Sequence, residues 1–312
     1  MSPRWIHRPS RPWRRFTLAA LAAAGLAVGA IWTNAFAVGD RFEGLLARIE
    51  LAIDPPPNRP TRPTVVVTPR PRPAGTLMAE LPADLPAGQS AGPAASSAEP
   101  SPSPVRSPVD VSILADPQAV FASQLDKDWC AVAGTQIVLA ILGAGDASDA
   151  FQRELAGRID EWVSWSDSHN GELGPAAIAE ALAAYGIPGY EIRAYESRAD
   201  ALRGSAIAIS QTGEPVVLLT WRGAHTWVMT GYRADADPTV FGDATVSGAY
   251  ILDPWYPRVS SIWGPSDPAG TFQDAAEMER NFLPWKRPDG HYPDRDGRYV
   301  VLVPTIWETP TG

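Results

Sequence analysis

Hydrophobic residues recur three or four positions apart over much of the stretch after residue 110, the spacing that predicts amphipathic helices. The predicted helices cover residues 130–142, 151–162, 175–185 and, with a weaker pattern, 197–204. Pro175 falls in the first turn of the third helix and Gly186 just past its end, as is common at helix boundaries. We interpret the charged stretch 191–200 as a solvent-exposed face, and residues 113–121 as a segment that leads into the domain.

The pattern changes after residue 214, where short and compact apolar runs replace the helical spacing. Such runs predict strands over residues 215–221, 226–232, 249–252 and 298–303. A helix-rich part followed by a strand-rich part predicts an α+β fold, in which a helical layer packs against a sheet. A cleft between the two layers is then the expected place for a site.

An uncharged run of 23 residues, 16–38, precedes this domain and is long enough to cross a bilayer, which takes about 20 residues. Five arginines stand before it, and the positive-inside rule keeps them in the cytoplasm, so everything after Gly39 is translocated. The run ends in Ala35-Phe36-Ala37, which is typical of a signal-peptidase site. Two interpretations stay open. One is a single-pass cell-membrane protein with an extracellular C-terminal domain, favoured by the length of the run, and the other is a secreted protein cleaved near Ala37.

A proline-rich stretch lies between the uncharged run and the domain, since 15 of the 32 prolines fall between residues 55 and 108. We expect a short amphipathic helix directly after the membrane segment, ending at the three prolines 55–57. The rest is predicted to be a disordered linker in polyproline II or coil conformation. The chain thus divides into residues 1–39, a basic segment with an anchor or signal, residues 40–109, the helix and linker, and residues 110–312, the folded domain.

The net charge of −9 is unevenly distributed. Residues 1–109 contain 12 Lys and Arg against 7 Asp and Glu, whereas residues 110–312 contain 14 against 28. An acidic domain repels phosphate backbones, which argues against nucleic acid as a partner. The single cysteine excludes an internal disulfide and a cysteine-based metal site, and the loop aspartates match no calcium-binding loop. We expect no metal, no cofactor and a monomer.

The single cysteine, Cys130, lies at the predicted N-terminus of a helix, where the helix dipole and free N–H groups favour a nucleophilic thiolate. Asp126 and Asp128 oppose a thiolate, so a nearby cation is needed, and a protonated histidine is its usual source. The alternative is a buried cysteine that serves only as a small hydrophobic residue.

Three histidines lie in the domain. His225 stands at the start of a predicted strand, where it is held rigidly and can face a cleft, whereas His169 and His291 lie in polar loops and are interpreted as surface residues. A catalytic imidazole needs an acceptor for its second ring nitrogen. Asp253, at the end of the next strand, can supply it if the two strands are neighbours. The alternative is that Asp253-Pro254 only begins a turn.

Gln124 stands six residues before Cys130. An acyl-transfer site needs hydrogen-bond donors for the oxyanion that develops on the attacked carbonyl. The Gln124 side-chain amide can join the Cys130 backbone N–H in this role. The alternative is a surface residue, which a lone glutamine usually is.

Residues 124–133, 225–232 and 251–254 together resemble the papain-like cysteine peptidases, and in particular their C39-like branch. The order Gln, Cys, His, Asp and the gap from Gln to Cys are those of the family. The resemblance implies a papain-like fold, in which an N-terminal helical half with the Cys helix packs against a C-terminal antiparallel sheet that carries His and Asp. It also implies the roles of four residues. These are Gln124 at the oxyanion, Cys130 as nucleophile, His225 as general base and Asp253 as the residue that orients the imidazole.

Two features limit what the resemblance carries over. Ala131 and Val132 follow the cysteine, where many members have Gly-Pro, although an alanine there leaves the Cys130 N–H accessible. The leader-processing members are fused to transporter domains, which nothing in this sequence resembles. The leader-peptidase role is therefore not carried over.

Three functions remain in competition. The first is an extracytoplasmic thiol hydrolase of peptide or isopeptide bonds, acting on a peptide or protein, with acyl transfer left open because one triad supports both. The second is a catalytically inert papain-like surface module that binds peptide or cell-wall material. The third is a structural surface protein in which Cys130 is only packing. Tryptophans beside the candidate residues, among the 12 of the chain, are interpreted as core or cleft-wall residues rather than as a substrate groove.

Overall fold

The structure is a computed structural model, and it describes Ile49, Ile53, Pro55 and residues 57–68, 104–168, 172–287 and 290–306. The chain divides into two compact units, Met1–Pro57 and Asn58–Gly312, and the architecture below is that of the second. Among the described residues, no helix has the length and apolar character needed to cross a bilayer. The predicted membrane segment, residues 16–38, lies outside them, so it stays a prediction.

In the described part of the chain, eight strands form one large sheet with the order β1-β3-β10-β4-β5-β6-β9, and β2 pairs with β5 beside this path. The strands are β1 Thr64–Val67, β2 Val109–Ser112, β3 Tyr190–Tyr195, β4 Val216–Thr220, β5 His225–Ala234, β6 Val246–Leu252, β9 Thr271–Asp274 and β10 Tyr299–Pro304. All neighbours are antiparallel except β1 and β3, which are parallel. A separate hairpin, β7 Val259–Ser260 with β8 Gly264–Pro265, follows β6 along the chain.

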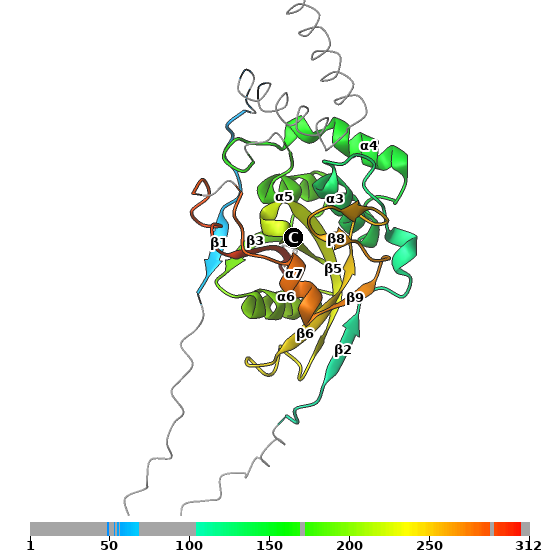
Figure 1. Cartoon of the computed structure of the whole chain (residues 1–312), viewed down its shortest axis with the longest axis vertical. Helices are drawn as coiled ribbons and strands as arrows, with labels where there is room; N and C mark the ends of the chain where they lie inside the picture. Colours follow the sequence, from blue (N-terminus) through cyan, green and yellow to red (C-terminus); the bar gives the residue numbers. More distant parts are fainter. Residues whose placement is uncertain are drawn as a thin grey trace, which may run out of the picture. The chain divides into compact units, whose positions relative to one another are not determined.

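Helices cover both faces of the sheet (Figure 1). On one face lie α3 Cys130–Ile141, α4 Asp149–Gly157 and α5 Pro175–Ala184, and on the other lie α6 Arg198–Thr212 and α7 Ala275–Asn281. Side chains of β4 alternate between the two hydrophobic cores, with Val217 and Leu219 in the first core and Val216 and Leu218 in the second. A strand buried on both faces has a continuous apolar sequence, which is why β4 is legible from the sequence alone.

A buried ion pair fixes the start of α5. The Asp167 carboxylate accepts the backbone N–H groups of Ala176 and Ala177 at 3.1 and 2.9 Å. It also pairs with Arg295 at 2.7 Å, and the two side chains are 0% and 5% exposed. Arg295 donates from Nε to the hydroxyl of Thr64 in β1 at 3.0 Å. One cation therefore ties together a helix, an edge strand and the loop before β10.

The α+β class is confirmed, and each helix and strand predicted after residue 110 is present. The short amphipathic helix predicted before the prolines 55–57 lies almost wholly outside the described residues, so it stays a prediction. The boundaries differ most for the fourth predicted helix, α6, which continues to Thr212, where Gly213 ends it in the left-handed conformation with φ 71°. The second helix is shorter than predicted, since α4 ends at Gly157 and a 3₁₀ turn, Ile159–Glu161, follows. The sequence predicted one helical layer, whereas the structure has a second layer, α6 and α7, on the other face of the sheet.

The interpretation of residues 191–200 as a solvent-exposed face is wrong. This stretch contains most of β3, which lies inside the sheet between β1 and β10. The buried side chains of the strand are Tyr190, Ile192, Ala194 and Tyr195. Glu191 and Arg193 alternate with them and pair with each other at 2.7 Å. Because charged residues occupy alternate positions, the apolar half of the strand did not stand out as a compact run.

A strand also lies within the range predicted as linker. The three consecutive valines 65–67 are β-branched, which favours the extended conformation seen in β1. Just before the strand, Arg59 donates to two backbone carbonyls of the turn Ile159–Glu161 at 2.6 and 2.7 Å. Residues 58–68 therefore belong to the folded unit, whereas residues 69–103 of the predicted linker lie outside the described residues.

Candidate active site

The two strands that carry the candidate imidazole and carboxylate are neighbours in the sheet. β5 begins at His225 and β6 ends at Leu252, and the strands pair antiparallel with Val228 opposite Leu252. Asp253, the next residue, therefore reaches the edge of the sheet at which His225 lies. His225 Nε2 and Asp253 Oδ1 are 2.6 Å apart, and the two residues are only 2% and 5% exposed. The same oxygen accepts the backbone N–H of Trp255 at 2.9 Å, which helps to hold the carboxylate in place.

Cys130 is half-buried at the first position of α3. Its sulfur lies 3.9 Å from the carbonyl oxygen of Ala224, the residue before His225, although 94 positions separate the two along the chain. Cys130 is also among the groups that raise the pKa of His225, so the two side chains lie near each other. Because Nε2 is bonded to Asp253, Nδ1 is the ring nitrogen left for the sulfur. The structure thus brings the predicted nucleophile, base and orienting carboxylate together.

A glycine lets the Cys helix approach the His strand. Gly134, one turn after Cys130, faces Thr226, the residue that follows His225. A Cβ at this position would lie 2.6 Å from the Thr226 Cγ2 atom, closer than real Cβ contacts. Glycine inside a helix is roughly 0.5–1 kcal/mol less favourable than alanine. Here it allows the sulfur to come up to the imidazole.

Burial is the largest single influence on the pKa of His225 and lowers it, but contacts at the ring edge together outweigh burial. The charge and hydrogen bond of the Asp253 carboxylate raise the pKa, and contacts with Cys130 add to the rise, so that it reaches about 9 from 6.5. The ring is therefore an imidazolium at neutral pH. This is the cation that a cysteine nucleophile at a helix N-terminus needs beside it.

Gln124 is buried beside this site, but its amide nitrogen is already engaged. Its backbone N–H donates to Pro254 O at 2.9 Å, so the residue lies against the turn that follows Asp253. Its Nε2 donates to the backbone carbonyls of Asp126 and Lys127, both at 2.8 Å, while Oε1 is buried with no hydrogen-bond partner among the described residues. An oxyanion would have to replace one of the two carbonyls. The oxyanion role of Gln124 therefore stays a prediction.

Tryptophan rings surround the imidazole. Trp221 stacks on His225 with ring centroids 4.0 Å apart and 21° between the planes. Trp255 meets the imidazole edge-on, at 6.3 Å and 83°. Trp263, between β7 and β8, stacks in turn on Trp221 at 5.8 Å and 8°. These rings shield one face and one edge of His225 from water.

Residues 118–279, just over half of the 312 residues, match the family model described as the Peptidase C39-like family. The chain belongs to the peptidase C39-like family. The matched stretch contains Gln124, Cys130, His225 and Asp253, and the resemblance predicted from the sequence is confirmed. Membership supports a cysteine peptidase fold for the unit described above.

Comparison with solved structures adds one similar chain and no functional argument. It is the crystal structure of a double glycine motif protease from an AMS/PCAT transporter, in complex with the leader peptide. The identity is 18% and the TM-score 0.31, over 59% of this chain and 89% of that chain. At this TM-score the similarity supports no conclusion. No curated protein matches the chain.

Two glutamines that the sequence reasoning missed hold the Gln124 loop of this C39-like unit against the Cys helix. Gln152 of α4 accepts the N–H of Leu125 at 2.6 Å and donates to Ser123 O at 3.0 Å, so it binds the residues on both sides of Gln124. It also donates to Gln136 Oε1 of α3 at 2.7 Å. All three glutamines are at most 1% exposed. The sequence shows only that each of two predicted helices contains a glutamine, and this does not predict which groups the two side chains bind.

Of the other two histidines of the domain, the structure describes His291, which is exposed as predicted. His291 packs edge-on against Tyr292, with ring centroids 4.6 Å apart, and against Trp165 at 6.3 Å. His169 lies outside the described residues.

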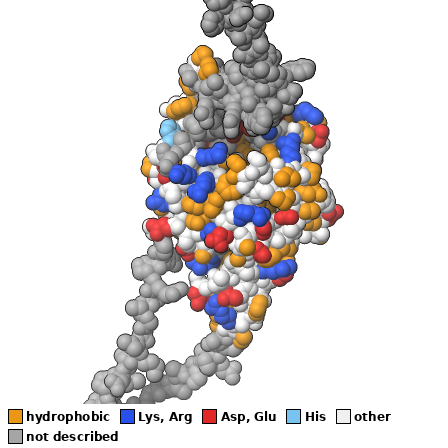
Figure 2. All heavy atoms as spheres, viewed as in Figure 1, with side chains coloured by type: hydrophobic (Ala, Val, Ile, Leu, Met, Phe, Trp, Pro, Cys, Tyr) orange, Lys and Arg blue, Asp and Glu red, His pale blue; other side chains and the backbone are white. Residues whose placement is uncertain are grey.

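Basic and acidic side chains are interspersed on the face of the molecule shown in Figure 2. Asp235 and Asp243, two of the loop aspartates considered for calcium, both pair with Arg106, at 3.0 and 2.9 Å. Within the described ranges, no three His, Cys, Asp or Glu side chains gather closely enough to hold a metal ion.

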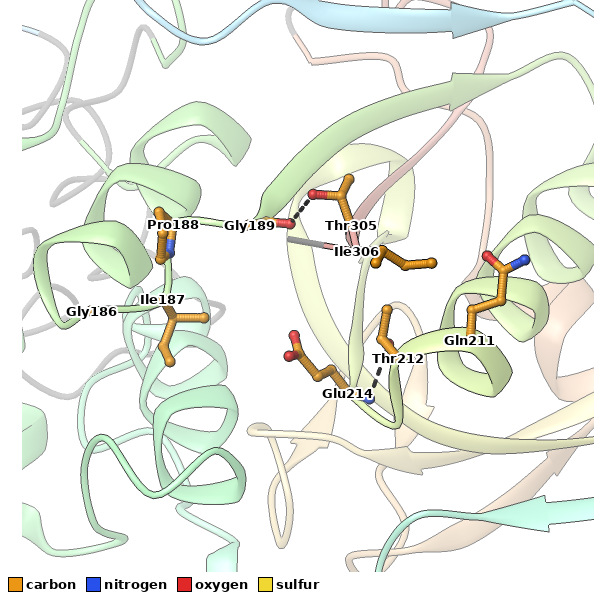
Figure 3. A pocket seen from close by; sticks show the side chains of 9 residues that line it. All are labelled: Gly186, Ile187, Pro188, Gly189, Gln211, Thr212, Glu214, Thr305 and Ile306. Carbon is orange, nitrogen blue, oxygen red and sulfur yellow. Dashed lines mark hydrogen bonds between the residues drawn. The ribbon is translucent and has the colours of Figure 1, made fainter. Parts of the chain in front are cut away.

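The pocket in Figure 3 lies apart from the candidate residues. It encloses about 480 Å³ and is lined by Gly186, Ile187, Pro188, Gly189, Gln211, Thr212, Glu214, Thr305 and Ile306. A smaller pocket, of about 370 Å³, does include Gln124 in its wall. Arg258 also lines it and donates to Leu125 O at 3.1 Å. Of these two pockets, only the smaller one has a candidate site residue, Gln124, in its wall.

Proposed function

We propose that this protein is an extracytoplasmic cysteine peptidase that cleaves peptide or isopeptide bonds through Cys130, His225 and Asp253. The observation that carries the proposal is the buried 2.6 Å contact between His225 Nε2 and Asp253 Oδ1, with the Cys130 sulfur 3.9 Å from the carbonyl oxygen of Ala224, the residue before His225. A buried ionic pair contributes little to stability compared with hydrophobic residues of the same volume. Strongly shifted histidines beside a nucleophile are, in contrast, common at catalytic sites.

In the proposed acylation step the Cys130 thiolate attacks the carbonyl carbon of the scissile bond and forms a C–S bond. Negative charge moves to the carbonyl oxygen, where the Cys130 backbone N–H can donate, since the first N–H groups of a helix have no intrahelical partner. Gln124 becomes the second donor when its amide exchanges one carbonyl partner for the oxyanion. His225 gives its proton to the leaving nitrogen, the C–N bond breaks, and the acyl group remains on sulfur.

Deacylation returns the site to its starting state. His225, now neutral, takes a proton from water as the oxygen attacks the acyl carbon, and the C–S bond breaks to release the carboxylic acid and the thiolate. Asp253 keeps the imidazole oriented and stabilises its charge throughout both steps. An amine in place of water would give acyl transfer by the same residues.

The proposed substrate is a peptide or protein met outside the cytoplasm by a monomeric enzyme. The five N-terminal arginines and the uncharged run 16–38 support this location. The run either anchors the protein in the cell membrane or is removed near Ala37, which releases the enzyme.

A catalytically inert, peptide-binding module is the second candidate, and one observation favours it. Both hydrogens of the Gln124 amide nitrogen are directed to backbone carbonyls rather than toward a substrate oxygen. A site without that donor can still hold a peptide in the cleft but stabilises an oxyanion poorly.

Alkylation of the single thiol separates these candidates. In the full-length protein we expect iodoacetamide to label Cys130 at pH 6 at least about tenfold faster than a free thiol, which is almost fully protonated at that pH. His225→Gln should abolish this advantage. A labelled peptide library should be cleaved by the wild type and left intact by Cys130→Ala. Slow labelling that His225→Gln does not change contradicts the proposal, and fast labelling without cleavage of any peptide supports the inert module.

A further inference from the structure

The hydrogen bond of His225 restrains the tilt of the ring only in part. Such a bond tolerates some misalignment, so the contact at Nε2 still permits the ring plane to turn by small angles about the Cβ–Cγ bond. A second ring stacked on the imidazole face removes that freedom. Trp221 is in this position, with centroids 4.0 Å apart and 21° between the planes.

We propose that Trp221, anchored by Asn281, is a positioning residue that fixes the plane of the His225 imidazole and stabilises its protonated form. The inference rests on the proposed function, in which His225 gives and takes the proton. It assigns to two residues outside the triad a defined effect on the base.

Trp221 is itself held in place by a buried hydrogen bond. Its Nε1–H donates to Asn281 Oδ1 at 2.9 Å, and the two residues are 8% and 4% exposed. Asn281 donates from Nδ2 to the backbone carbonyl of Glu277 at 3.1 Å. That bond orients the carboxamide so that its oxygen faces the indole.

Helix α7 fixes the position of Asn281. Asp274 caps the first turn of the helix by accepting two backbone N–H groups, at 2.9 and 3.0 Å. Met278 and Phe282 are fully buried in the second hydrophobic core, so the helix cannot roll without exposing them. The position of the indole is therefore set by the core of the domain and not by the imidazole it covers.

The backbone at Trp221 has a conformation that such a residue rarely adopts. Trp221 and Arg222 have φ of 51° and 64°, and Gly223 follows with 86°. Left-handed conformations of non-glycine residues persist where surrounding contacts determine them, and they concentrate at functional sites. Here the turn folds the chain back so that the indole lies over the ring four positions later.

A protonated imidazole under an indole face is also stabilised by the cation–π interaction. The charged or titratable groups on the elements around it are Cys130 of α3, Asp253 after β6, Arg222 of the same turn, Arg258 over Trp255, and Glu277 through Asn281. Asp253 and Cys130 act at the ring edge. The indole acts on the face, so its contribution can be removed separately.

The titration of His225 measures this contribution directly. NMR of histidine-labelled full-length protein should show few imidazole signals, since the chain has four histidines, and the signal lost in His225→Gln is that of His225. We expect Trp221→Leu to lower the midpoint by about 0.5–1.5 pH units, the equivalent of a desolvated cation–π contact. Trp221→Phe keeps a stacked ring and should shift it by less. Asn281→Leu, which keeps the indole but removes its acceptor, should fall between the wild type and Trp221→Leu.

Trp162→Leu is the matched control, because Trp162 is as buried as Trp221, at 8% exposure, but belongs to the first hydrophobic core, which does not include Trp221. An unchanged midpoint in folded Trp221→Leu overturns the inference, as does an equal shift in Trp162→Leu. If Trp221→Leu does not fold, an unchanged midpoint in Asn281→Leu overturns it. Peptide cleavage measured on the same samples separates the two proposals. If the wild type cleaves no peptide but the titration midpoint of His225 still depends on Trp221, this inference is supported and only the proposed function is contradicted.

Discussion

The buried pair of His225 and Asp253 makes the stability of the protein depend on pH in a direction that can be worked out. Folding raises the pKa of His225 from 6.5 to about 9. Below the lower value both states hold the proton, and the stabilisation is fully present. Between the two values the unfolded chain has lost the proton that the folded chain keeps, so the free energy of unfolding falls as the pH rises. The shift corresponds to about 3 kcal/mol, lost by the time the pH has passed through the folded pKa.

Asp253→Asn isolates this charge, because the asparagine oxygen can still accept the Nε2–H of a neutral imidazole. Without the carboxylate, burial lowers the pKa of His225 and little opposes it. The free energy of unfolding of the variant should then change little between pH 7 and pH 10, whereas that of the wild type falls by about 3 kcal/mol.

Urea unfolding followed by tryptophan fluorescence gives both curves, and the same series on His225→Gln serves as the baseline for all other titrating groups. If the wild type and Asp253→Asn show parallel pH profiles after this correction, the carboxylate does not hold the proton on His225. The reasoning behind the charged pair would then be wrong.

Three further substitutions test how the site is supported. Gly134→Ala places a Cβ 2.6 Å from Thr226 Cγ2, so it should lower the free energy of unfolding by about 1–3 kcal/mol and slow alkylation of the Cys130 thiol. An unchanged alkylation rate would contradict the role of this close approach. Gln152→Leu removes the bonds on both sides of Gln124 and, if Gln124 donates to the oxyanion as proposed, should lower kcat for peptides at least about tenfold, while alkylation, which needs no oxyanion, stays unchanged. An equal loss of both rates would point to general disruption. Arg295→Met leaves the buried Asp167 carboxylate without its cation and should destabilise the fold by about 3–5 kcal/mol in urea unfolding; a change below about 1 kcal/mol would show that the pair is dispensable.

Local patterns predicted those elements whose apolar positions stand out by themselves. The compact apolar run of β4 predicts a strand because both faces of β4 are buried. The spacing of apolar residues in α3 and α5 predicts helices because one broad face of each helix is buried. The edge at which His225 and Asp253 meet was also predictable, since an imidazole at a strand start and a carboxylate at the next strand end need only that the two strands be neighbours.

Elements whose burial depends on distant partners were not predictable in this way. β3 alternates charged and apolar residues, and its interior position follows from pairing with β1 and β10, which lie far from it in the sequence. The same holds for β1, a strand of four residues in a proline-rich stretch, because its sequence does not indicate that it pairs with β3.

The sequence by itself determined the class of fold, the order of the site residues and the position of a cysteine at a helix tip, because these depend on spacing along a single element. Only the tertiary structure decided that Trp221 covers the imidazole, that Gln152 binds both neighbours of Gln124, and that the Gln124 amide is occupied. Each of these is a contact whose partner is chosen by packing. A glutamine has the same donors and acceptor, and an indole the same faces, in every environment, so the residue type alone does not predict which neighbour it will contact.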